Sequence, residues 1–537
     1  MGEPGIVSRE STFGPARRKH AQPRSRSGDG RLATRGTSED WPTLELAPAA
    51  TRTRVRAGQL ALLAGLTALA AIVRLDATRG IWVDEAIGIR EAHLPFERML
   101  DVLRTTDFHP PLSFVPLWSS VHYLGDGELA VRLPSIIAGS LLVPMLFVAG
   151  RELYDARTGL VAAAFGAIAP LLVWYSQEAR MYALVMLLAV VAVWAQARVL
   201  RRGDVTGWSL YTVAAALMLW THYFTALQVL VQQLAFLVVA WHRARRGLES
   251  ARLLLAYFGS LLVLAVAALP LLTFAREQVD RPGPEGFDIL EPFPAQVSLA
   301  PSQADGLSIY RLFANAVWAI WGYHSGAVMS KLGALWPFAM LLALVLLGRR
   351  RSPPTVLLAA VGFIPPLLLA AMSFVQPEVF EVRYFAASIP ILLLLLARAA
   401  TISAASRAAS AVVVGAVLTT LLVGLADQQL NTSNPRRYDF RSALTAIERR
   451  AGPRDVIVYA PRYLEDVVSY YAPALRRQPV TERLPSPNKG RRVFLVASFL
   501  DHPDVARRTG AAVWKLRRQG RLVGRIERHQ VSTWVFR

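Results

Sequence analysis

Six short segments of the chain place acidic, histidine, arginine or tyrosine side chains beside long apolar runs. In order they read VDEA, HPPL, VRLPS, SQEARMYAL, THYF and VRYF, and they contain Asp84, Glu85, His109, Arg132, Glu178, Arg180, His222, Tyr223, Arg383 and Tyr384. Polar groups within or beside membrane spans are costly to desolvate, so they are functional candidates by default. A carboxylate can remove a proton from an acceptor hydroxyl, and an arginine fork can bind two oxygens of a phosphate.

Each segment taken alone also has a simpler structural explanation. Asp84 fits a helix N-cap, with Glu85 favourable to the helix dipole. Arg132 fits an arginine that snorkels to the membrane interface, and residues 176–180 fit a polar hairpin between two spans. An isolated histidine such as His222 is more often structural than catalytic. The functional hypothesis therefore depends on the ordered set and not on any single member.

The composition indicates a multi-spanning membrane protein. The chain has 537 residues, of which 53% are hydrophobic and only 18% are charged. Runs of roughly 20 apolar residues, each long enough to cross a bilayer, recur along it. About eleven spans are predicted, at 58–75, 133–150, 158–175, 181–198, 207–222, 224–241, 252–274, 331–348, 354–374, 384–397 and 408–426. A soluble enzyme, a disordered chain and a fibrous protein are excluded, and the absence of cysteine excludes disulfides, thiolate catalysis and Cys-ligated zinc.

The distribution of basic residues predicts the orientation of the chain. The net charge is +21, with 59 basic and 38 acidic residues. Because the arginines concentrate in the N-terminal tail and in alternate short linkers, the pattern favours the positive-inside rule over nucleic-acid binding. We therefore expect a cytoplasmic N-terminus, long loops outside the cell membrane and an extracytoplasmic C-terminus. Segment 110–125 is apolar but short, and we expect it to lie at the interface together with an amphipathic helix at 85–104.

Two further regions flank the predicted membrane domain of residues 57–426, whose first outer loop is 76–132. The basic tail 1–56 lacks apolar periodicity and is predicted to be disordered and cytoplasmic. Residues 427–537 are predicted to form a small extracytoplasmic α/β domain. Its helices are expected at 437–450, 462–471 and 503–519, and its strands at 455–460, 492–498 and 532–537. This domain contains no glycine-rich phosphate loop.

The ordered set of six segments resembles the GT-C class of membrane glycosyltransferases. It is most similar to the bacterial members of glycosyltransferase family 39, which include relatives of the protein mannosyltransferases and aminoarabinose transferases, and the resemblance covers about residues 58–400. It implies a polytopic α-helical GT-C fold in the plasma or inner membrane. It also implies a polyprenyl-phosphate-linked sugar as donor and a cell-envelope glycan, lipid or protein as acceptor. The acceptor hydroxyl would displace the lipid phosphate with inversion at the anomeric carbon.

The resemblance also assigns roles to the candidate residues. Asp84 would be the catalytic base, and Glu85 and Glu178 would orient the acceptor, the base or a metal. The departing phosphate would be bound by Arg132, Arg180 and Arg383. His109, His222, Tyr223 and Tyr384 complete the set of expected substrate contacts. The metal requirement stays open, with a divalent cation as one candidate.

The sequence departs from the protein mannosyltransferases and leaves alternatives open. Those enzymes carry a lysine after the His-Pro-Pro segment, where this chain has Leu112 and Ser113. The acceptor therefore stays open. A lipid or solute transporter would line a path with the same acids and arginines. A non-catalytic assembly subunit would use the outer domain to bind a partner. The gathering of polar residues at one face of the membrane, and not at its midplane, favours the transferase.

Overall fold

The computed structural model describes most of the chain outside the N-terminal tail. The described residues are 1–2, 55–75, 79–105, 107, 109–248, 250–279, 317, 320–324, 326–349, 352–372, 382–402, 406–434, 437–488 and 490–537. The tail predicted to be disordered lies almost entirely outside them. So do residues 280–316 and 373–381, which fall almost entirely in the long loops expected outside the membrane.

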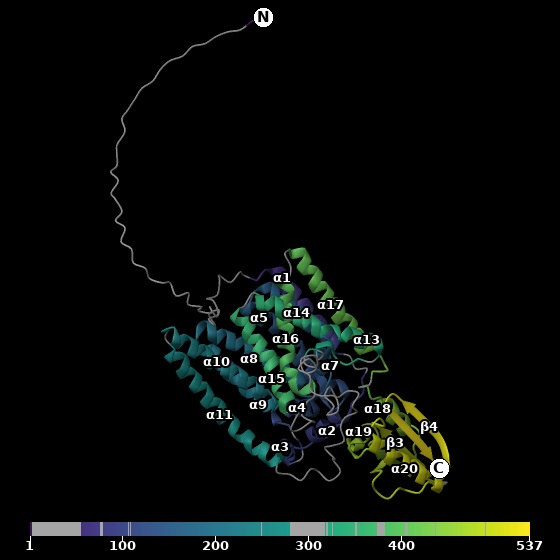
Figure 1. Ribbon diagram of the computed structural model, residues 1–537. Helices are drawn as coiled ribbons and strands as arrows, with labels where there is room; N and C mark the ends of the chain where they lie inside the picture. Colours follow the sequence, from purple (N-terminus) through teal and green to yellow (C-terminus); the bar gives the residue numbers. More distant parts are fainter. Residues whose placement is uncertain are drawn as a thin grey trace. The chain divides into compact units, whose positions relative to one another are not determined.

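The membrane part consists of helices (Figure 1). They are α1 (Ala57–Arg74), α5 (Glu128–Leu153), α6 (Ala156–Ile168), α7 (Pro170–Ser176), α8 (Tyr182–Arg202), α9 (Val205–Thr221), α10 (Thr225–Arg245), α11 (Ala251–Val279), α13 (Ala327–Gly333), α14 (Leu335–Arg349), α15 (Pro353–Met372), η3 (Val382–Ser388), α16 (Ile389–Ile402) and α17 (Arg407–Leu430). In the described part, eight helices are long and apolar enough to cross a membrane, and the bent pair α6–α7 would make a ninth. Shorter apolar helices cover the remaining predicted spans, at α9 and at α16.

Two local features position the helices that carry the candidate site. Gly150 of α5 faces Gly159 of α6 so closely that a Cβ on Gly150 would lie 2.7 Å from the Gly159 Cα. Small residues allow such close helix packing in membranes. The chain then bends by 59° between α6 and α7, where Pro170 removes a backbone donor. The buried Arg74 of α1 donates to the carbonyls of Gly166 and Ala167 at this bend, so it satisfies backbone groups at the end of α6.

Short helices follow α1 on the side where the candidate residues lie. These are α2 (Val83–Ala92), α3 (Phe96–Thr105), η1 (Pro111–Ser113) and α4 (Phe114–Leu124). The single amphipathic helix expected over 85–104 is instead two helices, because Pro95 cannot donate a backbone hydrogen bond and restricts the residue before it. With only 11 residues, α4 is too short to cross a membrane.

The C-terminal region forms a five-stranded mixed sheet in the order β2-β1-β3-β5-β4. Its elements are α18 (Phe440–Glu448), β1 (Val456–Ala460), η4 (Arg462–Leu464), α19 (Glu465–Tyr471), β2 (Arg476–Pro479), β3 (Val493–Ser498), α20 (Pro503–Gln519), β4 (Leu522–Arg528) and β5 (Val531–Phe536). β1 pairs in parallel with β2 and β3, and β5 is antiparallel to β3 and β4. Strands β2 and β4, which the sequence pattern did not predict, are the two edges.

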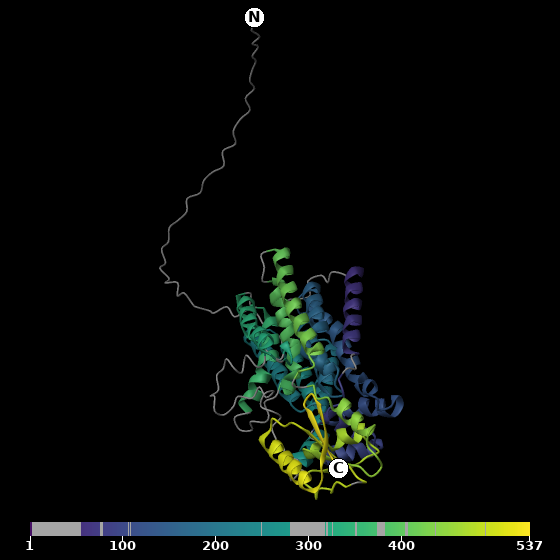
Figure 2. The same ribbon diagram turned by 90° about the vertical axis from the view of Figure 1, so that its right-hand side faces the viewer.

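This domain shares a hydrophobic core with the short helices near the membrane part. Ile89 of α2 and Met99 of α3 belong to the same buried cluster as Phe440 of α18 and Val467 of α19. A separate cluster, which includes Leu516, lies under α20 on the other face of the sheet. Figure 2 shows the yellow sheet at the end of the helical bundle that carries the short helices. The shared core connects the C-terminal domain to the helix that carries Asp84 and Glu85.

Candidate active site

Asp84 and Arg383 form an ion pair at the beginning of α2. Asp84 lies in the first turn of this helix, where the helix dipole favours a carboxylate. Arg383 lies in η3, just before the buried helix α16. Its Nη1 is 3.1 Å from Asp84 Oδ2, and the side chains of Arg383 and Asp84 keep 12% and 19% of their exposure. Both groups are thus partly buried but accessible to a ligand.

Arg180 connects Asp84 to His109. Its Nη1 donates to the Asp84 carbonyl at 3.4 Å, and its Nη2 lies 3.3 Å from His109 Nε2. His109 Nδ1 is in turn 2.6 Å from Asp107 Oδ1. Because a carboxylate oxygen accepts, His109 Nδ1 is the donor in the contact with Asp107.

The surrounding charges favour the ionised forms of Asp107 and Arg180. Burial alone would raise the pKa of Asp107, but His109 and Arg180 lower it to about 2. Burial would lower the pKa of Arg180, but nearby acids, Asp84 first among them, raise it above its ordinary value. Two arginine cations therefore lie beside the Asp84 carboxylate, a suitable environment for an anionic group.

Aromatic rings pack beside this charged group. The His222 ring lies 6.2 Å from the His109 ring, 5.8 Å from the Tyr384 ring and 6.1 Å from the Tyr182 ring. His222 Nε2 and the Tyr182 hydroxyl are buried without a hydrogen-bond partner among the described residues. Buried polar groups are normally paired, so these two atoms are available to hydroxyl groups of a ligand.

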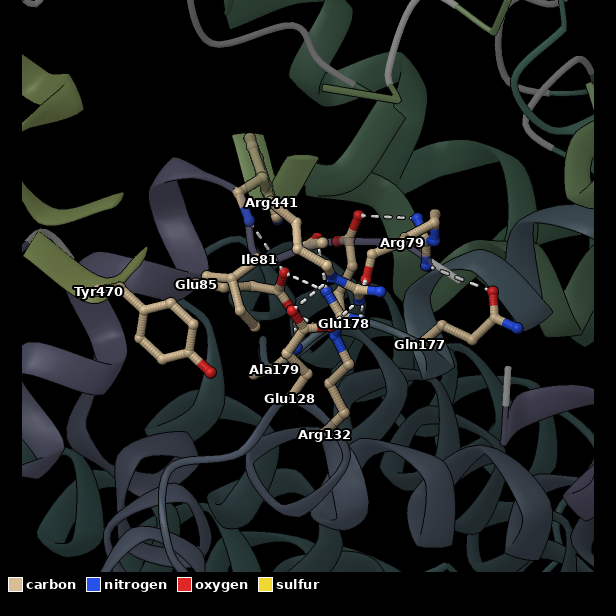
Figure 3. A network of polar contacts seen from close by, with 12 residues as sticks. Arg79, Ile81, Glu85, Glu128, Arg132, Gln177, Glu178, Ala179, Arg441 and Tyr470 are labelled. Carbon is tan, nitrogen blue, oxygen red and sulfur yellow. Dashed lines mark hydrogen bonds and ion pairs between the residues drawn. The ribbon is translucent and has the colours of Figure 1, made fainter. Parts of the chain in front are cut away.

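Glu85 is adjacent to Asp84 but belongs to a different network, drawn in Figure 3. Its fully buried carboxylate accepts from Arg132 Nε at 2.7 Å, from Arg132 Nη2 at 2.6 Å and from the Ala179 amide at 2.8 Å. Burial would raise the pKa of Glu85, but Arg132 holds it below its ordinary value. The expected catalytic pair of carboxylates is therefore separated, and these contacts favour a positioning role for Glu85.

The hydrogen-bond donors of the Arg132 guanidinium are also paired within the protein. Besides the pair with Glu85, its Nη1 donates to the Arg79 carbonyl at 2.7 Å and its Nη2 to the Gly80 carbonyl at 2.9 Å. Each nitrogen of the guanidinium thus has a protein acceptor. This geometry argues against the predicted contact between Arg132 and a donor phosphate, because breaking it would leave Glu85 buried and unpaired.

Two other predicted residues lie away from Asp84. Glu178 Oε1 is 3.8 Å from Arg79 Nη1, so Glu178 belongs to the network of Glu85 (Figure 3). The Tyr223 hydroxyl donates to Gln278 Oε1 of α11 at 2.9 Å. The structure therefore brings together Asp84, His109, Arg180, His222, Arg383 and Tyr384. It places Glu85, Arg132 and Glu178 in a second network, and Tyr223 reaches the group only through Gln278, whose Nε2 donates to the His109 carbonyl at 3.4 Å.

Three further residues, which the six sequence segments did not indicate as candidates, contribute to these networks. Asp107 lies two positions before His109, and Tyr182 lies inside the segment that contains Arg180. The only sequence feature that could have indicated these two residues is their closeness to His109 and Arg180. Arg79 carries no such signal, because its role depends on stacking over the Trp174 ring, 3.8 Å from its centroid, and on the contact with Glu178.

A pocket adjoins this site. The pocket is lined by Ser113, Phe114, Leu117, Val131, Pro134, Ser135, Ala179, Arg180 and Met181. It lies beside the guanidinium that contacts the Asp84 carbonyl. Within the described ranges, no group of three or more His, Cys, Asp or Glu side chains is arranged to hold a metal ion.

Comparisons with known proteins found one matching family model and several similar folds. A family model described as dolichyl-phosphate-mannose-protein mannosyltransferase matches residues 108–272. A sequence search of curated proteins found no match. The fold is similar to crystal structures of ArnT from Cupriavidus metallidurans. In the apo state the TM-score is 0.53 at 13% identity, covering 89% of this chain and 98% of that chain. The structure bound to undecaprenyl phosphate gives a TM-score of 0.53 at 13% identity, covering 90% and 98%. Together with the ordered segments, these similarities identify the chain as resembling the GT-C membrane glycosyltransferases.

Proposed function

We propose that this protein transfers a sugar from a polyprenyl-phosphate-linked donor to an acceptor hydroxyl at the outer face of the cell membrane, with inversion. The observation that carries the proposal is the partly buried Asp84–Arg383 pair, with the Arg180 guanidinium beside it. It joins one carboxylate that can accept a proton to two cations that can bind a phosphate. That ArnT from Cupriavidus metallidurans, which has this fold, binds undecaprenyl phosphate supports the choice of donor.

The proposed reaction is a single displacement. Asp84 removes the proton of the acceptor hydroxyl as that oxygen forms a bond to the anomeric carbon. The bond from the anomeric carbon to the phosphate oxygen breaks, and polyprenyl phosphate leaves with its electron pair. Arg383 and Arg180 stabilise the negative charge that grows on the phosphate. His222 and the Tyr182 hydroxyl, which are buried without protein partners in the described part, would bind sugar hydroxyls.

The position of the charged groups supports transfer more than transport. Asp84 and Arg383 lie at the ends of helical elements, beside the short helices and the C-terminal domain. In secondary transporters the substrate site instead typically lies near the bilayer midplane, at broken helices between repeats. The apolar spans support a multi-pass membrane location. The arginine distribution supports a cytoplasmic N-terminus and an extracytoplasmic site.

The direct test is a donor assay with purified protein. The full-length chain is incubated with a panel of polyprenyl-phosphate sugars and a mixture of cell-envelope acceptors, and the release of polyprenyl phosphate is followed. We expect release from at least one donor, together with labelled acceptor. If no donor on the panel is consumed while the folded protein transports a lipid or solute in vesicles, the protein is a transporter and the transferase hypothesis is wrong.

A further inference from the structure

The backbone that leads into α2 is held by two residues of the C-terminal domain. Arg441, near the start of α18, donates from Nη2 to the Arg79 carbonyl at 3.0 Å. Tyr471, the last residue of α19, accepts at its hydroxyl from the Ile81 amide at 2.6 Å. Ile81 lies only three residues before Asp84. The C-terminal domain therefore contacts the main chain directly ahead of the proposed base.

Both residues are themselves fixed by Glu128. The Glu128 carboxylate accepts from Arg441 Nε at 2.8 Å, and a second contact joins Arg441 Nη2 to Glu128 Oε2. The Tyr471 hydroxyl donates to Glu128 Oε1 at 2.6 Å. Glu128 is the first residue of α5, one turn before Arg132, so the two residues lie on the same face of that helix. In Figure 3, Arg441 and Arg132 enter the network from different elements.

Residues of both domains therefore form hydrogen bonds with the backbone of segment 79–81. The Arg79 carbonyl accepts from Arg132 of the membrane domain and from Arg441 of the C-terminal domain. Between these contacts, Gly80 allows a close approach that a side chain would obstruct. A Cβ on Gly80 would lie 3.1 Å from both Arg441 Cβ and the Tyr471 hydroxyl.

We propose that Arg441 and Tyr471 are positioning residues for sugar transfer, which fix the 79–81 backbone and through it the placement of Asp84. This inference rests on the proposed function and gives the C-terminal domain a part in it. A base must be held close to the proton that it removes, and a displacement of about 1 Å can cost on the order of 100-fold in rate. The arrangement makes the active-site backbone depend on a domain more than 300 residues away in sequence, since Tyr471 is 390 positions from Ile81.

The test compares two neighbouring tyrosines of α19 in the full-length protein. Tyr471→Phe removes the hydroxyl that bridges Ile81 and Glu128 with almost no change in volume. Tyr470→Phe is the matched control, because its hydroxyl also bonds across the domain contact, but to the Asp126 carbonyl at 2.8 Å and not to the backbone of Ile81. We expect Tyr471→Phe to lower kcat by about 10- to 100-fold with an unchanged donor KM, and Tyr470→Phe to keep both constants. Wild-type kcat in Tyr471→Phe, or an equal loss in both variants, would overturn the proposal.

Hydrogen–deuterium exchange of peptides covering residues 79–92 gives a second readout that does not need activity. We expect faster exchange at the Ile81 amide in Tyr471→Phe and wild-type exchange in Tyr470→Phe. Unchanged exchange in Tyr471→Phe would also overturn the inference. If the wild-type protein consumes no donor while exchange still responds as expected, it is the proposed function that fails, and the domain contact remains a structural one.

Discussion

The Oδ2 atom of Asp84 lies 3.1 Å from Nη1 of Arg383, which is 299 positions further along the chain. This contact joins the proposed base to the proposed phosphate ligand. A phosphate that binds Arg383 would compete with Asp84 for the guanidinium, so donor binding would release the carboxylate for proton transfer. The pair thus provides a simple physical link between donor binding and readiness for the reaction.

Asp84→Asn should abolish most of the transfer activity. The amide keeps the size of the carboxylate but cannot accept the proton, and loss of a general base typically costs about 10²- to 10⁴-fold in rate. We expect this loss in kcat, measured by release of polyprenyl phosphate. Asp155→Asn is a matched control, because Asp155 also pairs with an arginine, Arg398, at 2.9 Å, just beyond the end of α5 that lies opposite to Arg132. Near wild-type turnover of Asp84→Asn would refute the proposed mechanism.

Glu85→Gln should act mainly on stability. The substitution leaves the Arg132 guanidinium buried without its carboxylate, and removing one partner of a buried ion pair typically costs about 3–5 kcal/mol. We therefore expect a clearly lower unfolding midpoint in detergent for Glu85→Gln than for Asp84→Asn. The converse result, a stable Glu85→Gln protein without activity, would place Glu85 in the chemical step.

The sequence predicts the membrane spans but not the strands β2 and β4, and the reason lies in their patterns. The spans are long apolar runs, and each run predicts a helix without reference to its neighbours. β2 has four residues with the sequence RRQP, and β4 reads LVGRIER with mostly exposed side chains. Short or charged segments of this kind are common as edge strands. They become strands because the neighbouring buried strand offers backbone groups for pairing.

The same limit applies to the two carboxylates at the start of α2. Sequence proximity indicated that Asp84 and Glu85 share a helical turn, where successive residues point about 100° apart. It could not indicate which of them faces Arg383 and which faces Arg132. That choice depends on helix α5 and on η3, which are distant in sequence. The role of Arg441 depends in the same way on the docking of a separate domain.

The predicted orientation can be tested by chemical labelling. The chain has no cysteine, so a single Arg507→Cys variant carries one reactive thiol on the exposed face of α20. We expect a membrane-impermeant maleimide to label this residue in intact cells. Labelling only after the cells are permeabilised would reverse the proposed orientation and with it the outer-face site.

Glu91 should make the stability of the protein fall as the pH rises. Burial and the nearby Asp107 raise the pKa of Glu91 to about 8, against the attraction of Arg90 and Arg180, with Asp466 adding a further repulsion. The ordinary pKa of the group is 4.5, so between these values the folded protein keeps a proton that the unfolded chain releases. Folding is then favoured at the lower pH and becomes less favourable as the pH rises towards 8.

Glu91→Gln should remove this dependence. We expect the unfolding midpoint of the wild type in detergent to drop between pH 5.5 and 8.5, and that of Glu91→Gln to change less. Glu97→Gln on α3 is the control, because Glu97 is exposed and the substitution should leave the wild-type profile intact. A profile of Glu91→Gln that matches the wild type would contradict the assignment.

Arg383→Lys separates phosphate binding from simple anchoring at the membrane interface. An arginine fork grips two phosphate oxygens, while a lysine offers a point charge. Loss of one charge-assisted hydrogen bond, about 1.5–3 kcal/mol, corresponds to roughly 10- to 150-fold weaker donor use. Lysine anchors a helix at the interface as well as arginine does, so a pure anchor would tolerate the change.

Arg398→Lys provides the matched control for this last prediction. Arg398 lies in the same helix α16 that follows Arg383, pairs with an aspartate at 2.9 Å and stacks on a tyrosine ring at 4.7 Å. Arg383 makes the same two kinds of contact, with Asp84 at 3.1 Å and with the Tyr384 ring at 5.3 Å. We expect Arg383→Lys to raise the donor KM or lower kcat/KM while Arg398→Lys leaves both unchanged, with similar unfolding midpoints for the two variants. If both variants use the donor as the wild type does, Arg383 serves only to pair with Asp84 and to anchor its segment, and the phosphate must be bound elsewhere.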